Sequence, residues 1–171
     1  DGMNIELGGF TMSRKEISSL DRINIVACGS AFYASLVGVD FLRKFTNITV
    51  EAFRASEFPA ESVCSKRTLT IGVSQSGETK DTLDALHDAK KEGSHIAAFC
   101  NVIGSTMSRL TGNGAYLHAG PEYAVASTKA FTNMVAVFAL LGVTLSKHSG
   151  KMDEELVAEM RKLPARITNL L

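Results

Sequence analysis

Short apolar runs that are typical of buried strands alternate with segments of helical periodicity along most of this chain. The runs that predict strands are residues 22–30, 48–53, 68–74, 95–101 and 115–119. The segments with apolar residues at helical spacing are residues 31–45, 81–93, 105–110 and 126–145. Strands separated by helices pair in parallel, and both faces of such a sheet must be covered. The sequence therefore predicts an α/β fold, a three-layer α/β/α sandwich around a five-stranded parallel sheet.

The chain has 171 residues, which is enough for one domain with a sizeable core. We expect that domain to span residues 21–147. Residues 1–20 form an edge segment in which "SRKEISSL" predicts one or two helical turns. Residues 148–171 predict an amphipathic helix that Pro164 kinks or breaks. Because the first residue is Asp1 rather than Met, we interpret the chain as a piece of a longer protein.

The composition argues against two classes of partner. Lys and Arg together number 18, as do Asp and Glu, so the net charge is zero and no basic face for nucleic acid is indicated. The apolar stretch 130–145 contains Thr, Asn and Gly, and we interpret it as a buried helix that falls short of a membrane span. We therefore expect neither a nucleic-acid nor a membrane partner.

The spacing of cysteine and histidine residues gives no sign of a metal site. Cys28, Cys64 and Cys100 show no C-x-x-C spacing, which fits a reducing compartment and predicts a cytoplasmic protein. The four histidines are scattered without metal-ligand spacing. We expect no metal and no cofactor.

Three loops rich in small or hydroxyl-bearing residues follow predicted strands. They are "CGS" (28–30), "SQSGET" (74–79) and "EYAVAST" (122–128). In open parallel sheets, ligands bind beyond the carboxyl ends of the strands. We therefore expect these loops to meet at one edge of the sheet and to form a binding site.

The middle loop resembles a nucleotide-binding loop with one decisive difference. "GVSQSGET" matches G-x-x-x-x-G-K-[ST] except that Glu78 stands where the phosphate-neutralising lysine would be. A carboxylate there disfavours a triphosphate, but backbone N–H groups at a helix N-terminus and the neighbouring hydroxyl groups suit a single phosphate monoester. The alternative is that "SQSGET" merely caps the following helix, and spacing alone favours neither interpretation.

Other reactive side chains have ordinary explanations. Cys28 ends a strand and could be a nucleophile, although a buried and inert thiol is the simpler interpretation. Glu122 could be a general base near the edge of the sheet, and the alternative is an exposed loop carboxylate. Lys129 is interpreted as a solvated or ion-paired lysine.

The motifs "ACGSAFYASLVG", "ASEF", "SQSGETKDTL", "CNVIGST" and "GPEYAVASTKAFTN", in this order, resemble the first sugar-isomerase (SIS) half of the glutamine–fructose-6-phosphate aminotransferases. The resemblance runs from about residue 7 to residue 145. It implies a five-stranded α/β/α sandwich that binds fructose 6-phosphate and glucosamine 6-phosphate. It also implies three partners: a second SIS half, a glutaminase domain and a second copy of the enzyme in a homodimer.

The resemblance also assigns site residues. Ser74, Gln75, Ser76 and Thr79 correspond to the phosphate cradle. The residues that correspond to contacts with the sugar phosphate outside this loop are Ser30, Ser127 and, through its backbone, Val125. The family commonly reads C-G-T-S where this chain reads C-G-S-A, so Ala31 lacks a hydroxyl that can contact the sugar. One lost hydrogen bond would cost about 0.5–1.5 kcal/mol.

In this family the acid–base residues lie in the second half, and this chain has no second copy of the loop motif. We therefore expect no catalytic residues here and no isomerisation by the chain alone. One alternative is a complete single-SIS sugar-phosphate isomerase, for which the candidate catalytic residues are Glu57, Glu122 and His118. Another is a SIS module that only senses a sugar phosphate.

Overall fold

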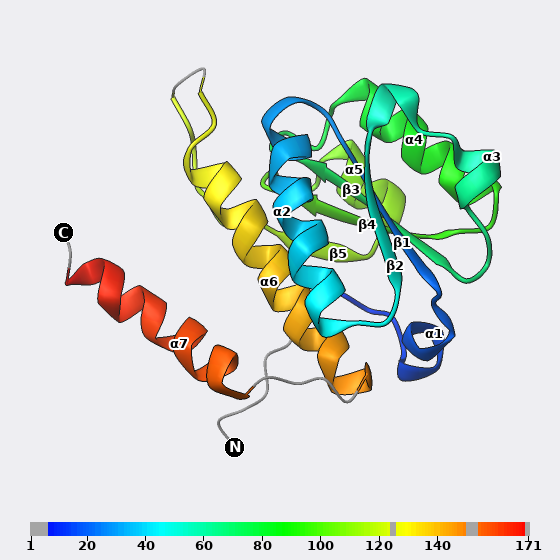
Figure 1. Ribbon diagram of the computed structural model, residues 1–171. Coiled ribbons are helices and arrows are strands. Elements are labelled where there is room, and N and C mark those ends of the chain that lie inside the picture. The colour runs from blue at the N-terminus through cyan, green and yellow to red at the C-terminus, as the bar shows by residue number, and fades with distance from the viewer. Residues whose placement is uncertain (1–6, 124–125, 150–153, 170–171) are drawn as a thin grey trace.

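The computed structural model describes residues 7–123, 126–149 and 154–169. Within them, five parallel strands form one sheet in the order β2-β1-β3-β4-β5 (Figure 1). The strands are β1 (Arg22–Ala27), β2 (Thr49–Arg54), β3 (Thr68–Ser74), β4 (His95–Cys100) and β5 (Gly114–Tyr116). The predicted five-stranded parallel sheet is confirmed.

Helices cover both faces of the sheet, as predicted (Figure 1). The helical elements are α1 (Arg14–Ser19), α2 (Gly29–Phe45), η1 (Ala55–Glu57), α3 (Ala60–Val63), α4 (Lys80–Lys91), α5 (Thr106–Thr111), α6 (Lys129–Ser149) and α7 (Glu154–Thr168). One face carries α2 and α6, which share the larger buried cluster with the strands. The other face carries α4 and α5, with Leu86 and Met107 fully buried in a second cluster.

The central strand β3 is buried at every position, as its apolar and β-branched sequence predicts. Ile71 pairs with Ile25 of β1, and both side chains are fully buried. Burying each such side chain contributes about 1.5–3 kcal/mol. The helices packed on the two faces of the sheet therefore hold β1 and β3, and with them the carboxyl ends of these strands, in place.

Close helix packing accounts for the apolar character of α6. A Cβ atom at Gly38 of α2 would lie 2.5 Å from the ring of Phe138, so only glycine lets the two helices approach this closely. By length and composition, residues 129–147 could cross a membrane, which corrects the expectation that this stretch falls short of a span. However, 56% of that segment is buried inside the protein, and the predicted buried helix is confirmed.

Several boundaries differ from the predicted ones. Two short elements, η1 and α3, were not predicted because three or four residues show no periodicity. The strand β5 ends at Tyr116 rather than at residue 119, and His118 has a left-handed φ of 52°. α6 begins at Lys129 and ends at Ser149, later at both ends than predicted.

The amphipathic tail forms one continuous helix, α7, with Pro164 inside it, so the predicted break is wrong. Glu159 pairs with Lys162 at 2.7 Å and with Arg166 at 2.8 Å. Lys162 lies before the proline, so only the Glu159–Arg166 pair links the turns on its two sides. This pair compensates in part for the backbone hydrogen bond that proline cannot donate.

Candidate functional site

The predicted site residues meet at the point where the chain changes direction across the sheet. From β1 the chain goes first to β2 on one side and then to β3 on the other, which opens a crevice at their carboxyl ends. A cavity of about 260 Å³ lies there, and we call it the switch-point cavity. It is lined by Cys28, Gly29, Ser30, Ala31, Val73, Ser74, Gln75, Ser76, Thr79, Ser127 and Met134. Val125 lies outside the described residues.

The loop 74–79 forms a compact set of hydroxyl groups, which we call the cradle. Ser74 Oγ lies 2.9 Å from Thr79 Oγ1 and 3.4 Å from Ser76 Oγ, and it accepts a hydrogen bond from Gly77 N at 3.1 Å. Ser76 Oγ accepts one from Glu78 N at 3.1 Å. Because these bonds form within the loop, the hydroxyl groups hold a defined shape.

The hydroxyl groups of the cradle do not cap the helix that follows. Thr79 is the N-cap residue of α4, but its side chain makes no capping hydrogen bond. The first N–H groups of a helix have no partner within the helix, and the helix dipole makes this end favourable for an anion. The interpretation of "SQSGET" as a helix cap is therefore not supported by the contacts of Thr79.

Glu78 does not project into the cavity. Its Oε1 atom accepts a hydrogen bond from Thr106 N at 2.8 Å, at the start of α5. This bond is the main reason that the pKa of the Glu78 carboxyl is lowered, so the group is ionised at neutral pH. Glu78 occupies the position that a lysine has in nucleotide-binding loops, and its carboxylate is directed toward α5 instead of the cavity.

The third loop brings one unsatisfied hydroxyl group to the cavity. Ser127 Oγ is buried and has no hydrogen-bond partner among the described residues, although buried polar atoms are nearly always paired. Glu122 Oε1 accepts hydrogen bonds from Thr128 N at 3.0 Å and Ala130 N at 3.1 Å. These two bonds lower the pKa of Glu122 and orient the start of α6, so Glu122 caps a helix and does not line the cavity.

Asn101 links the loop 74–79 to the segment 119–120, which precedes the third loop, and it was not identified from the sequence. Its backbone N–H donates to Gln75 O at 3.1 Å. Its side chain accepts from Ala119 N at 2.8 Å and donates to Gly120 O at 2.9 Å. The signal for it was present in the sequence, because Asn101 directly follows a strand at the carboxyl edge. Met134 was also missed, because its place on the buried side of α6 gives no sign of a cavity.

The candidate catalytic residues do not gather at the cavity. No carboxylate, imidazole or lysine is among its lining residues in the described part of the chain. Cys28 does line it, with Sγ 3.9 Å from Thr82 Oγ1. Glu57 is exposed on η1, and His118 lines a different cavity. Within the described ranges there is also no group of three His, Cys, Asp or Glu residues that could hold a metal ion.

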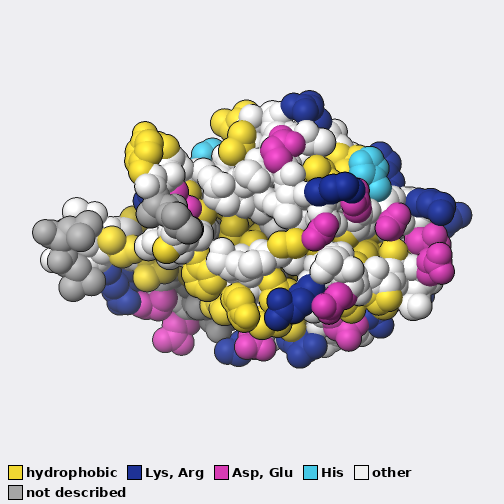
Figure 2. Space-filling model, turned by 90° about the horizontal axis from the view of Figure 1, so that it is seen from above, with side chains coloured by type: hydrophobic (Ala, Val, Ile, Leu, Met, Phe, Trp, Pro, Cys, Tyr) yellow, Lys and Arg dark blue, Asp and Glu magenta, His cyan; other side chains and the backbone are white. Residues whose placement is uncertain are grey.

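The carboxyl edge of the sheet faces the viewer in Figure 2. Uncharged side chains and backbone occupy much of the middle of this face, and most charged side chains lie toward its margins.

Comparisons with known proteins agree with this geometry. A family model described as SIS domain matches residues 16–144. The chain belongs to the SIS-domain family. It is 39% identical to a glutamine–fructose-6-phosphate aminotransferase of Bacteroides thetaiotaomicron over 98% of this chain. The match with the Chlorobaculum tepidum enzyme is 43% over 93% of this chain.

A solved structure gives the same result for the SIS fold. The C-terminal domain of glucosamine-fructose-6-phosphate aminotransferase from Francisella tularensis superimposes with a TM-score of 0.80 at 28% identity. The alignment covers 89% of this chain and 43% of that domain. The chain spans only 28% of the length of the Bacteroides relative, so it corresponds to one part of a larger enzyme.

Proposed function

We propose that this chain is the first SIS unit in the isomerase module of a glutamine–fructose-6-phosphate aminotransferase. In this role it binds the phosphate of fructose 6-phosphate or glucosamine 6-phosphate in the switch-point cavity. The observation that carries the proposal is the convergence of the cradle, the uncapped start of α4 and the buried, unpartnered Ser127 Oγ.

The phosphate would be held without a cationic side chain. Ser74, Ser76 and Thr79 supply hydroxyl donors, Gln75 supplies an amide, and the first turn of α4 supplies backbone N–H groups and a favourable dipole. The contacts to the rest of the sugar phosphate would come from Ser30, Ser127 and the backbone of Val125.

Chemistry at the sugar carbons would require a second unit. Moving a proton between the first two carbons of a ketose phosphate requires a general base within hydrogen-bond reach. The lining of the switch-point cavity, as far as the structure describes it, offers no carboxylate, imidazole or lysine for that step. We propose that a second SIS half supplies these groups and a glutaminase domain supplies ammonia. We further propose that the enzyme is a cytoplasmic homodimer.

Calorimetric titration of the chain tests the binding role. The ligands are glucosamine 6-phosphate and fructose 6-phosphate, with the unphosphorylated sugars as controls. We expect binding that requires the phosphate and that weakens about two- to tenfold in Ser76→Ala and in Thr79→Ala. The matched control is Ser62→Ala, which removes an exposed hydroxyl group on α3 away from the cavity.

The same preparations distinguish the alternatives. Equal affinity for phosphorylated and free sugars would contradict the cradle. Absence of binding to the isolated chain, followed by binding when the second half is added, would mean that the cavity is completed by that half. Turnover of fructose 6-phosphate by the isolated chain would contradict the proposal that a second SIS half supplies the acid–base groups. It would favour a single-SIS isomerase.

A further inference from the structure

Glu78 interrupts the cradle sequence with a negative charge, and its contacts give it a role. It lies between Ser76 and Thr79, whose hydroxyl groups line the cavity. Its own side chain leaves the cavity and bonds to Thr106 N at 2.8 Å. Its backbone N–H donates to Ser76 Oγ at 3.1 Å, so the backbone of Glu78 is bonded directly to one cradle hydroxyl.

The cradle contacts the first turn of α5 and its N-cap residue, Ser105. Gly77 O accepts a hydrogen bond from Met107 N at 3.0 Å. A Cβ atom at Gly77, whose φ is +69°, would lie 2.2 Å from Ser105 Oγ. The backbone of the loop therefore touches this segment directly, and Glu78 adds a side-chain bond to the same place.

The Glu78 side chain attaches to α5 a part of the loop that is otherwise held by bonds within the loop, from Glu78 N to Ser76 Oγ and between Thr79 Oγ1 and Ser74 Oγ. The bond from Met107 fixes the carbonyl of Gly77, which precedes Glu78, and α4 begins only after Thr79. With Glu78 bonded to Thr106 N, the loop is attached to the first turn of α5 at two consecutive residues, Gly77 and Glu78. The carboxylate also lies where the start of α5 favours a negative charge, so it is not directed at a ligand anion.

We propose that Glu78 is a positioning residue, which holds the cradle in its phosphate-binding shape by bonding to the N-terminus of α5. This proposal rests on the proposed function for the identity of the ligand. The part of the proposal that concerns the shape of the loop does not depend on the proposed function, because that shape can be measured without a ligand. Glu78 itself does not touch the phosphate in this account.

The test compares three variants of the full chain by two measurements. Glu78→Ala removes the acceptor, and Glu78→Gln keeps an oxygen acceptor without the charge. The matched control is Glu16→Ala. Glu16 accepts hydrogen bonds from Ser13 N at 2.8 Å and Ser13 Oγ at 2.6 Å, in the cap of α1 outside the switch-point cavity. The measurements are amide hydrogen exchange without ligand and calorimetric affinity for glucosamine 6-phosphate.

We expect Glu78→Ala to accelerate exchange of the Gly77 and Met107 amides about tenfold and to weaken binding about three- to tenfold. Glu78→Gln should restore both values to within about threefold of wild type, and Glu16→Ala should leave them unchanged. Tighter or unchanged binding by Glu78→Ala would mean that the carboxylate only repels the phosphate, and it would overturn the proposal. The proposal would also be overturned if Glu78→Gln did not restore the slow exchange of the Gly77 and Met107 amides.

The two measurements separate this proposal from the proposed function. If the wild-type chain does not bind glucosamine 6-phosphate, the proposed function fails, and the exchange rates still decide whether Glu78 holds the loop. If the wild-type chain binds and the exchange rates of Glu78→Ala match those of wild type, only the role of Glu78 is refuted.

Discussion

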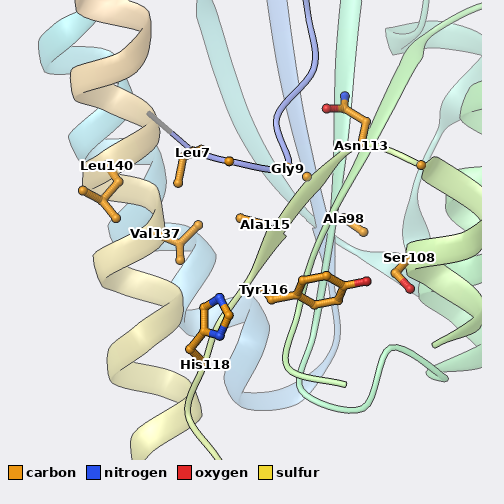
Figure 3. Close-up of a pocket in the computed structure, with 13 residues that line it drawn as sticks. Leu7, Gly9, Ala98, Ser108, Asn113, Ala115, Tyr116, His118, Val137 and Leu140 are labelled. Atoms are coloured by element: carbon orange, nitrogen blue, oxygen red, sulfur yellow. The ribbon is translucent and has the colours of Figure 1, made fainter. Parts of the chain in front are cut away.

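Two cavities at different parts of the sheet differ in size and in the state of their polar groups. The larger, about 610 Å³, lies at the outer edge of β5 between the segment 7–9 and α6, and we call it the β5-edge cavity (Figure 3). Its lining residues are Leu7, Gly8, Gly9, Ala98, Ser108, Gly112, Asn113, Gly114, Ala115, Tyr116, His118, Val137 and Leu140. The switch-point cavity has less than half this volume.

Two polar groups of the β5-edge cavity, the Asn113 side chain and the Gly114 N–H, already have partners. Asn113 accepts from Thr11 N at 2.9 Å and donates to Ile96 O at 3.3 Å, and Gly114 N donates to Gly9 O at 2.8 Å. The switch-point cavity instead has a buried hydroxyl without a partner and the open start of a helix. We therefore favour the switch-point cavity as the ligand site although it is smaller, because a ligand would recover hydrogen bonds that its groups lack.

The largest difference between the two cavities should come from a pair of glycine substitutions. Gly77→Ala places a Cβ atom at a φ of +69° and against Ser105, so we expect a loss of about 3 kcal/mol in the free energy of unfolding. Sugar-phosphate affinity should fall more than about a hundredfold. Gly112→Ala, at a φ of +57° with no atom within 4 Å, should cost about 1 kcal/mol and leave affinity unchanged. Denaturant unfolding and calorimetry measure both. If Gly77→Ala and Gly112→Ala lowered affinity equally, the affinity data would no longer assign the ligand to the switch-point cavity.

A pair of asparagine substitutions should give the next largest effect. Asn101→Ala removes two side-chain hydrogen bonds that hold the segment leading to Ser127, and we expect sugar-phosphate affinity to fall about tenfold. Asn113→Ala removes the bonds to Thr11 and Ile96, so it should release the N-terminal segment and leave affinity unchanged. Titration with glucosamine 6-phosphate checks the first effect, and hydrogen exchange at Thr11 checks the second. Weaker binding by Asn113→Ala would argue that the β5-edge cavity contributes to the ligand site.

A smaller effect is expected from a pair of serine substitutions. Ser127→Ala removes a buried hydroxyl that has no partner, so the free chain should be as stable as wild type or more stable, while affinity falls about two- to tenfold. Ser108→Ala removes a hydroxyl that donates to Ser105 O at 2.9 Å, so it should lower stability by about 0.5–1.5 kcal/mol without changing affinity. Thermal unfolding and calorimetry on both variants check this opposite pattern. A loss of stability in Ser127→Ala would reveal a partner for that hydroxyl in the free protein.

The smallest effect should appear on acidification. The carboxylates that bond to the first turns of α5 and α6, Glu78 and Glu122, have lowered pKa values in the folded state. Their contribution to stability is therefore complete above the unfolded value of about 4.3 and is lost as the pH falls through the lowered values. Amide exchange at Thr106 and Thr128, corrected for its intrinsic pH dependence, should increase below about pH 4 before that at Gly114 does. Simultaneous loss of protection at all three amides would show that acid opens the whole domain at once.

Much of the fold and the composition of the site could be predicted from the sequence. The strand β3 and the helix α4 form close to where the sequence predicts them, because an apolar run and helical periodicity are local patterns. The location of Ser74 and Ser127 at one edge also followed, because parallel strands direct their carboxyl ends the same way. The short elements η1 and α3 could not be predicted, since they are stabilised by contacts outside their own few residues.

The sequence by itself determined which residue types follow each strand and therefore which chemistry one edge of the sheet carries. Only the tertiary structure decided how those groups are used. Glu78 follows a glycine in the loop, and no pattern in the sequence indicates that its carboxylate reaches Thr106, which lies 28 positions further along the chain. Likewise, no pattern in the sequence indicates that the Ser127 hydroxyl is buried without a hydrogen-bond partner among the described residues, because this depends on how the loop packs. The physical reason is that hydrogen bonds form between groups that are close in space, and contacts between distant loops are set by the packing of the sheet and its helices.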